Sequence, residues 1–141
     1  MSFTPPRSPY DKVGGIVFFG RLIDKIRLHL AGKLPDTYNL GESNWYFFDA
    51  RCTRFLGVTF ADLVARVKRG GSDETLLRWC FRHGRKPSDE EIDIWNTFMM
   101  KRGLEDAVSD GVEEGKRLAG LKRRKDIRTF FELIDAEEGR R

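Results

Sequence analysis

Hydrophobic residues recur at helical spacing from the beginning of the chain. In residues 13–32, the longest apolar-rich stretch, one face of a helix with about 100° per residue carries five apolar side chains. They are Phe19, Leu22, Ile23, Ile26 and Leu30. The opposite face is charged, but Val17 and Leu28 lie among the charges, which indicates a helix covered by neighbouring elements. A short strand over residues 16–19 is an alternative for the beginning of this segment, because a four-residue apolar run fits either structure.

Further apolar stripes with helical spacing follow a loop at residues 33–43. They lie at residues 48–56, 60–67, 76–81, 92–99 and 127–134. Ser72 and Ser88 each precede acidic residues in a first helical turn, and Ser88 forms a capping box with Glu91. These signals predict helices with well-defined beginnings.

Residues 104–120 give a weaker helical signal. Val108, Val112 and Leu118 are placed on one apolar face, but Gly111 and Gly115 each cost about 1 kcal/mol relative to alanine in a helix. The segment therefore predicts a marginal helix.

Short links and helical periods predict an all-α fold, a single compact domain of about five to seven helices around one aromatic-rich core. The chain has 11 Phe, 3 Trp and 3 Tyr for this core. Trp79 and Trp95 occupy equivalent positions after their capping serines, and we expect both to be buried in it. Residues 1–12, with three prolines, are expected to form an extended N-terminal arm, residues 13–136 the helical domain, and residues 137–141 a flexible tail.

Composition narrows the class of protein. Of 141 residues, 40% are hydrophobic and 34% are charged, which is typical of a folded domain rather than a disordered chain. There is no apolar run of 18 residues to span a membrane and no apolar stretch of a signal peptide, so we expect a cytoplasmic protein. The net charge of +4, from 26 basic and 22 acidic residues, is only mildly basic for a nucleic-acid-binding protein.

Motifs for catalysis, metals and cofactors are missing from the sequence. Two Cys and two His at distant positions lack the close spacing of zinc ligands, so we expect no metal site. There is no G-x-S-x-G nucleophile motif, phosphate-binding loop or dinucleotide-binding loop, so no catalytic residue and no cofactor are predicted. Cys52 and Cys80 are expected to be buried free thiols.

Charged residues in the first predicted helix are the candidate site. They are Arg21, Asp24, Lys25, Arg27 and His29. Both Arg21 and Arg27 lie three residues from Asp24 and can reach it, so a self-neutralising ion-pair network is the structural interpretation. In the functional interpretation, the same five residues bind a ligand, and arginines held by a carboxylate receive an anionic group.

Short landmarks follow one another over residues 14–96. They are LDK-x-R and AGK in the first helix (Leu22, Asp24, Lys25, Arg27, Ala31, Gly32, Lys33), LG (Leu56, Gly57), SDE (Ser72, Asp73, Glu74), and the tryptophans Trp79 and Trp95. In this order they resemble a family of small bacterial proteins classified as a domain of unknown function. The chain departs from that pattern at Ile23, which separates Leu22 from Asp24, and over residues 38–48. The resemblance implies a bacterial origin, but no activity, cofactor or catalytic residue.

Three functions remain open at this point. The leading hypothesis is a small cytoplasmic helical protein that acts as a non-catalytic binding or regulatory module. A second hypothesis is weak nucleic-acid binding through basic clusters, namely residues 78–86 and the run KRRK at residues 122–125. A third is an enzyme or anion-ligand protein with its site on the first helix. The candidate partners are an anionic small molecule or a protein, nucleic acid would bind weakly at most, and no membrane partner is expected.

Overall fold

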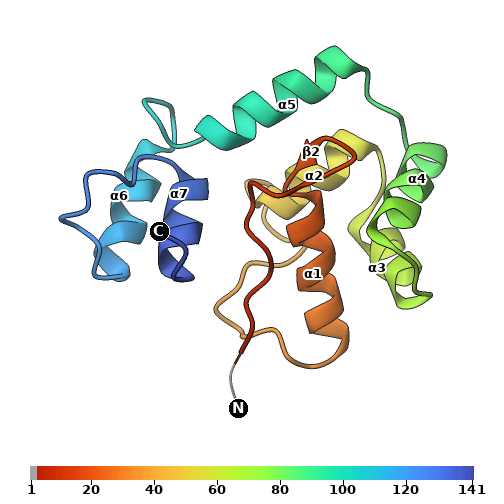
Figure 1. Cartoon of the computed structure of the whole chain (residues 1–141), viewed down its shortest axis with the longest axis horizontal. Helices are drawn as coiled ribbons and strands as arrows, with labels where there is room; N and C mark the ends of the chain where they lie inside the picture. Colours follow the sequence, from red (N-terminus) through yellow and green to blue (C-terminus); the bar gives the residue numbers. More distant parts are fainter. Residues whose placement is uncertain (1–2) are drawn as a thin grey trace.

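The computed structural model describes residues 3–141, and over this range the chain forms seven helices and one two-stranded antiparallel hairpin (Figure 1). The hairpin strands are β1 (Lys12–Val13) and β2 (Ile16–Val17). The helices are α1 (Phe19–Leu30), α2 (Phe48–Leu56), α3 (Phe60–Lys68), α4 (Asp73–His83), α5 (Asp89–Lys101), α6 (Ser109–Leu118) and α7 (Phe130–Glu137). The predicted all-α class is confirmed, since the hairpin is the one small addition among the described residues.

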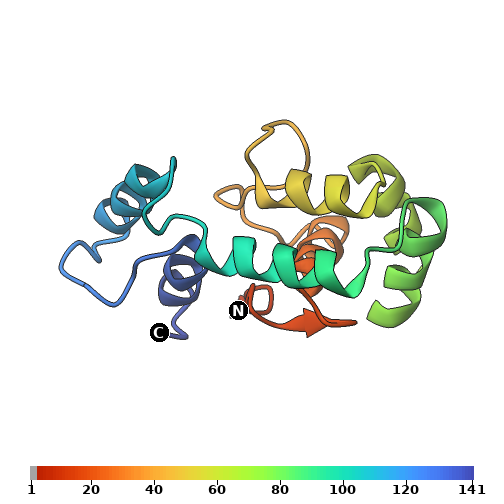
Figure 2. The same ribbon diagram turned by 90° about the horizontal axis from the view of Figure 1, so that it is seen from above.

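Helix α1 lies in the middle of the molecule, with α3 and α4 on one side and the pair of α6 and α7 on the other (Figure 1). Helix α5 crosses above the hairpin and contacts both β2 and α7. Seen from above, α5 runs from the end of α4 to the α6–α7 pair (Figure 2). It therefore links the two sides of the fold. No helix within residues 3–141 combines the length and apolar character needed to cross a membrane.

The long apolar segment of residues 13–32 is divided by a tight turn. Gly14 and Gly15 have φ values of 57° and 80°, as a two-residue hairpin turn of type I′ requires. The strand alternative is thus confirmed for Ile16 and Val17, and the helix begins at Phe19. The apolar side chains of Ile16, Val17 and Phe19 are fully buried, because the strand and the helix pack in the same core.

Two side chains of α5 fix this hairpin. Asn96 Oδ1 accepts a hydrogen bond from the Val17 amide at 3.0 Å, and its Nδ2 donates to the Gly15 carbonyl at 2.8 Å. The Trp95 indole donates to the Val17 carbonyl at 3.2 Å. A strand of two residues is held in place by these side-chain bonds rather than by a wider sheet.

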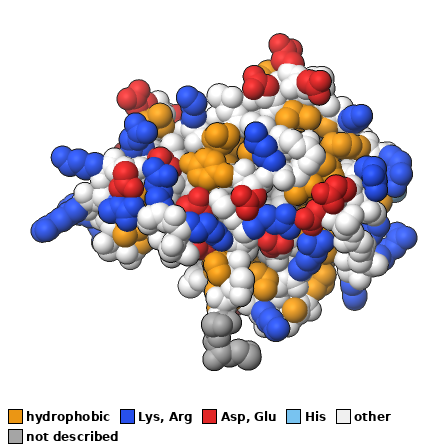
Figure 3. All heavy atoms as spheres, in the orientation of Figure 1, with side chains coloured by type: hydrophobic (Ala, Val, Ile, Leu, Met, Phe, Trp, Pro, Cys, Tyr) orange, Lys and Arg blue, Asp and Glu red, His pale blue; other side chains and the backbone are white. Residues whose placement is uncertain are grey.

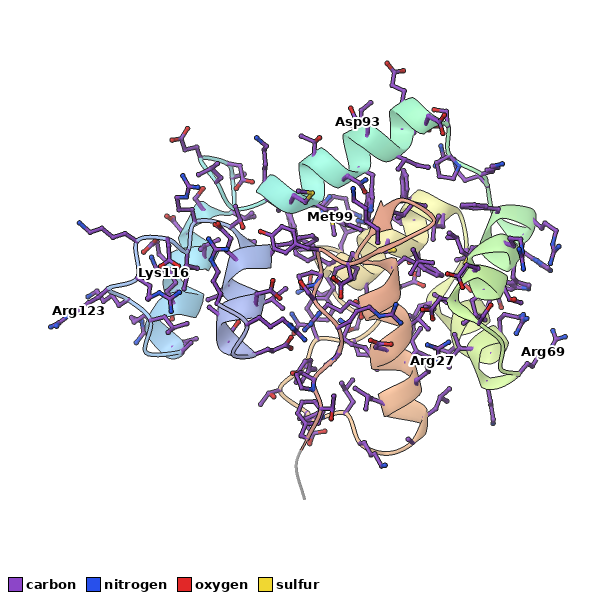
Figure 4. All side chains as sticks on the ribbon, in the orientation of Figure 1. Arg27, Arg69, Asp93, Met99, Lys116 and Arg123 are labelled. Atoms are coloured by element: carbon purple, nitrogen blue, oxygen red, sulfur yellow. The ribbon has the colours of Figure 1, made fainter. Side chains whose placement is uncertain are left out.

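The main core lies between α1 and the helices around it. Trp95 is buried in it and stacks on Phe55, with ring centroids 4.5 Å apart. Trp79 packs against the same core but is only partly buried, and its ring stacks on His83. In Figure 4, Met99 points from α5 toward the body of the molecule, whereas Asp93 points away from it. Both tryptophans thus contact one core, as expected, but the expected burial is found for Trp95 alone, and it was wrong for Trp79, which lies at the edge.

Helices α6 and α7 enclose a small separate cluster, which contains Val112 and Leu133. A Cβ on Gly115 would lie 2.5 Å from Leu133 Cδ2, so the glycine lets α7 approach α6 closely. The glycines that weaken the sequence signal are therefore packing positions. Leu118 is 72% exposed, so the expectation that it shares a buried face with Val112 was wrong.

Candidate functional site

The five candidate charges of α1 divide between two faces of the helix. Arg21 and Lys25 are four residues apart, are almost fully buried, and line a cleft toward α7. Asp24 and Arg27 contact the N-terminal arm and α4 instead, and Figure 4 shows Arg27 on the side of α1 that faces α3 and α4. His29 is exposed near the end of the helix. The structure thus brings two of the five residues to the cleft.

Asp24 belongs to a closed network of two carboxylates and two arginines. Arg7 donates from Nη2 to Asp24 Oδ1 and from Nη1 to Asp73 Oδ2, both at 2.8 Å. Arg27 Nη1 donates to Asp73 Oδ1 at 2.9 Å and lies 3.8 Å from Asp24. Burial alone would raise the pKa of Asp24, but the hydrogen bonds and charge of Arg7, with the charge of Arg27, lower it below its ordinary value. On this face of α1, the charges therefore form the self-neutralising ion-pair network of the structural interpretation.

The cleft has a volume of about 630 Å³ and lies between α1, residues 37–49 and the α6–α7 pair. Its apolar walls include Phe18, Phe48, Phe130 and Leu133. Its polar groups include Arg21, Lys25, Tyr38 and Arg102. Aromatic walls with a few convergent polar groups are the usual composition of a small-molecule site.

The central polar group of the cleft is the ion pair of Lys25 and Asp49. Lys25 Nζ lies 2.6 Å from Asp49 Oδ1, and the two side chains are 6% and 1% exposed. Lys25 donates to the Asn39 carbonyl at 2.8 Å, and Asp49 Oδ2 accepts from the Gly41 amide at 2.9 Å. The contact of Lys25 Nζ with Asp49 Oδ1 is short, but its angles depart from those of a well-aligned hydrogen bond, and no other donor within residues 3–141 bonds this oxygen. Burial lowers the pKa of Lys25, and the charge of Asp49 opposes that effect only in part.

A second buried pair closes one end of the cleft. Arg21 donates from Nη1 and Nη2 to the two oxygens of Glu138, each at 2.8 Å. The Tyr38 hydroxyl donates to Glu138 Oε2 at 2.7 Å. Burial raises the pKa of Tyr38, and its bond to the Glu138 carboxylate raises it further. The residue after α7 is thereby attached to α1, which sets the distance between the walls.

Phe18, at the base of the cleft, has a strained backbone. Its φ of 74° and ψ of −31° lie in a region that costs a bulky residue about 1–3 kcal/mol. The ring is buried, and Lys25 Nζ lies 5.5 Å from its centroid. The strained residue thus places an aromatic ring directly beneath the buried ammonium group.

Sequence reasoning did not find the partners of the two cleft cations. Asp49 lies in an aromatic-rich segment, and Glu138 lies in the predicted tail, 117 residues from Arg21. One signal was present, because a lysine on a covered helix needs a buried acid somewhere in the chain. That requirement predicts a partner but does not identify its position.

The two cysteines do not line the cleft, although Cys52 lies one helical turn after Asp49 on α2. Cys52 and Cys80 are buried free thiols, as expected. Burial raises the pKa of Cys80 to about 12 and that of Cys52 well above its ordinary value, so both disfavour the reactive thiolate. In the described part of the chain, no three His, Cys, Asp or Glu residues are grouped as metal ligands. On the face drawn in Figure 3, acidic and basic side chains are interleaved.

Comparison with known proteins gives a family without an activity. A family model described as Domain of unknown function (DUF5069) matches residues 3–140, which include both walls of the cleft. No curated protein matches the chain. The function must therefore be argued from the site.

Proposed function

The chain belongs to the family described as Domain of unknown function (DUF5069), and we propose that this member is a non-catalytic binding protein for a small amphipathic anion. The ligand occupies the cleft between α1 and α7. The observation that carries this proposal is the buried Lys25 ammonium group at the edge of a cleft with aromatic walls. A cytoplasmic location in a bacterial cell is part of the same proposal.

The size and walls of the cleft support a small molecule. A volume of about 630 Å³ lies within the range of about 300–1,000 Å³ for ligand sites. Phe18, Phe48 and Phe130 supply apolar surface, which favours an apolar or aromatic body. Gly111 and Gly115 on the opposite wall leave room for the side chains of Phe130 and Leu133, which line the cleft.

Lys25 supports an anionic head group. An ammonium group has three donors, and among the described residues those of Lys25 meet the Asn39 carbonyl at 2.8 Å and Asp49 Oδ1 at 2.6 Å. Its ion pair with Asp49 neutralises the charge but leaves donor capacity, and a buried pair with incomplete hydrogen bonding is costly. A ligand oxygen beside Nζ would complete the bonding of this group.

Charge balance limits the ligand to at most a single negative charge. Lys25 is matched by Asp49, and Arg21 is matched by Glu138, so the cleft has little excess positive charge to hold a polyanion. Arg102 lines the cleft as well but pairs with Asp106 at 3.3 Å. A monoanion with an apolar body therefore matches the cleft better than a nucleotide does.

The experiment compares 4-phenylbutyrate with its uncharged amide by isothermal titration calorimetry. We expect the carboxylate to bind at least about tenfold more tightly, since the two probes differ only at the group that meets Lys25. In the double variant K25M/D49N, which removes both charges, the carboxylate should lose this advantage. Asp24→Asn is the matched control, because it changes a charge on the other face of α1 and should leave binding unchanged.

Two results would contradict the proposal. One is equal affinity for the acid and the amide in the parent protein. The other is an unchanged preference for the acid in a folded K25M/D49N variant, with folding verified by circular dichroism.

A further inference from the structure

A second surface of different character lies where residues 45–46 and α2 meet α5. Four large apolar side chains are exposed there: Trp45 at 58%, Tyr46 at 60%, Ile94 at 61% and Phe98 at 38%. Together with Arg51 and Arg54 they form what we call the α2–α5 face. Solvent-exposed side chains of this size are unusual when they lie next to one another, and such patches mark interaction sites.

A groove of about 520 Å³ runs along this face. Helices α2 and α5 border it and lie alongside each other in Figure 2, and the stacked rings of Phe55 and Trp95 join them at its floor. Ile94 and Phe98 are four residues apart on α5, so they line one side together. Two neighbouring helices with an apolar floor form the kind of groove that accepts a third helix.

Three arginines gather around two exposed rings of this face. Arg51 and Arg54 lie 5.1 and 4.6 Å from the Trp45 ring, and Arg51 and Arg102 lie 5.1 and 5.3 Å from the Phe98 ring. Burial, and then the charges of Arg102 and Arg54, lower the pKa of Arg51. The positive charges of Arg54 and Arg102 therefore lie close enough to repel that of Arg51.

These arginines lack enough acidic partners of their own. Over residues 3–141, neither Arg51 nor Arg54 forms an ion pair, and Arg51 Nε is buried without a hydrogen-bond acceptor. Only Arg102 of the three pairs with a carboxylate, Asp106. A carboxylate from another molecule would relieve the repulsion and bind the planar guanidinium through two parallel hydrogen bonds.

We propose that the α2–α5 face binds an amphipathic acidic helix of a partner protein. Apolar side chains at i, i+3, i+4 and i+7 would enter the groove beside Ile94 and Phe98, and acidic residues flanking that stripe would meet Arg51 and Arg54. The α2–α5 face is a separate site from the ligand cleft, although Tyr46 and Arg102 also line the cleft. The partner helix is defined by its chemistry, namely an apolar stripe with carboxylates at its border.

Single-stranded nucleic acid fits the same face less well. Bases bind such surfaces by stacking on aromatic ring faces. Here guanidinium groups already lie over the rings of Trp45 and Phe98, and the groove floor is apolar rather than charged. The arrangement favours aliphatic side chains with acidic neighbours over bases with phosphates.

Fluorescence anisotropy with a labelled designed peptide tests the proposal. The peptide is an amphipathic helix of about 18 residues, with leucines on one face and glutamates flanking them, and its matched control has lysines in place of the glutamates. We expect the acidic peptide to bind and the basic one to bind at least about tenfold more weakly. Ile94→Asp should abolish binding, since it places a carboxylate in the groove.

Arginine variants distinguish an effect of the charges on the α2–α5 face from an effect of the net charge of the protein on peptide binding. R51A/R54A should weaken binding of the acidic peptide by at least about tenfold. K122A/R123A removes the same charge from the basic run at residues 122–125 and should leave affinity unchanged. Arg123 points away from the body of the molecule in Figure 4, so this control leaves the groove intact. Circular dichroism and thermal melting verify that each variant is folded.

Three outcomes would overturn the proposal. The first is equal binding of the acidic and basic peptides. The second is binding of a single-stranded oligodeoxythymidine that is tighter than that of the acidic peptide and is lost in R51A/R54A, which would assign the face to nucleic acid. The third is a dimer in analytical ultracentrifugation that Ile94→Asp dissociates, which would assign it to a second copy of the chain.

Discussion

Replacement of Lys25 by methionine tests whether the cleft contains a truly buried charge pair. Methionine fills a similar volume, so the main effect is to leave the Asp49 carboxylate, only 1% exposed, without its cation. A carboxylate in such a place will either remain as an uncompensated buried charge or take up a proton.

Both outcomes, the uncompensated charge and the protonated carboxyl, give a similar loss of unfolding free energy. Removing one partner of a buried pair costs about 3–5 kcal/mol. Protonating an aspartate with an ordinary pKa near 3.9 costs about 4 kcal/mol at pH 7, at about 1.36 kcal/mol for each pH unit. For a chain of this length we expect a decrease in melting temperature of roughly 10–15 °C.

The loss should depend on pH with a definite sign. If the variant folds with this carboxyl protonated, the folded state binds one more proton than the unfolded state, so stability falls as pH rises. Lowering the pH from 7 to 5 should therefore recover about 2–3 kcal/mol of the loss in urea denaturation. The double variant K25M/D49N should regain most of it at pH 7, because no charge is left behind.

A loss below about 1 kcal/mol at pH 7 would refute the reasoning, since that is the value of an exposed pair. A large loss that is constant between pH 5 and pH 7 would refute it as well. In that case the loss of stability would come from changed packing rather than from the unpaired Asp49 carboxylate.

Two further predictions concern the rest of the fold. Asp24→Asn should cost about 1–3 kcal/mol at pH 7, between the values for exposed and buried pairs, because Arg7 and Asp24 are each about a quarter exposed. The pKa of Asp24 lies below its ordinary 3.8 in the folded state, so this stabilisation is present above pH 3.8 and is lost at lower pH. In urea denaturation, the difference in unfolding free energy between the parent and Asp24→Asn should therefore be smaller at pH 3 than at pH 7. Gly84→Ala should cost at least about 2 kcal/mol, since its Cβ would lie 2.0 Å from the Leu56 carbonyl oxygen. Gly120→Ala, whose φ is +73° but which has free space around it, should cost only about 1 kcal/mol, and equal losses in thermal melts would contradict the proposed clash.

Helix positions could be predicted from the sequence because their signals are local. The predicted capping box of Ser88 and Glu91 is present, with the Glu91 amide donating to Ser88 Oγ at 3.1 Å. The hairpin could only be given as an alternative, since its two-residue strands depend on Asn96 and Trp95, which come about eighty residues later. Helix α6 gave a weak signal because its glycines serve the approach of α7, a contact that periodicity does not record.

The candidate site was predicted in part for the same reason. Arg21 and Lys25 share a face of α1 by their spacing, and this follows from the sequence. Which charges form a closed network depends on Arg7 and Asp73, and which line a cleft depends on Asp49. These partners come from segments that approach α1 only in the folded chain.

The number of hydrogen bonds distinguishes the two sets of charges on α1 better than burial does. In the Asp24 network, Asp24 and Asp73 each lie within ion-pair distance of both Arg7 and Arg27, so the charges balance and the carboxylates are well occupied. Lys25 and Asp49 are equally balanced in charge, but the pair borders a cleft rather than another element, and the three donors of the Lys25 ammonium group meet only the Asn39 carbonyl and Asp49 Oδ1 among the described residues. A saturated network gains nothing from an added anion, whereas an unsaturated one gains a hydrogen bond. The charges of one helix, four of them basic or histidine around a single aspartate, therefore divide between a structural network on one face and, on the other, the cleft that we propose binds a ligand.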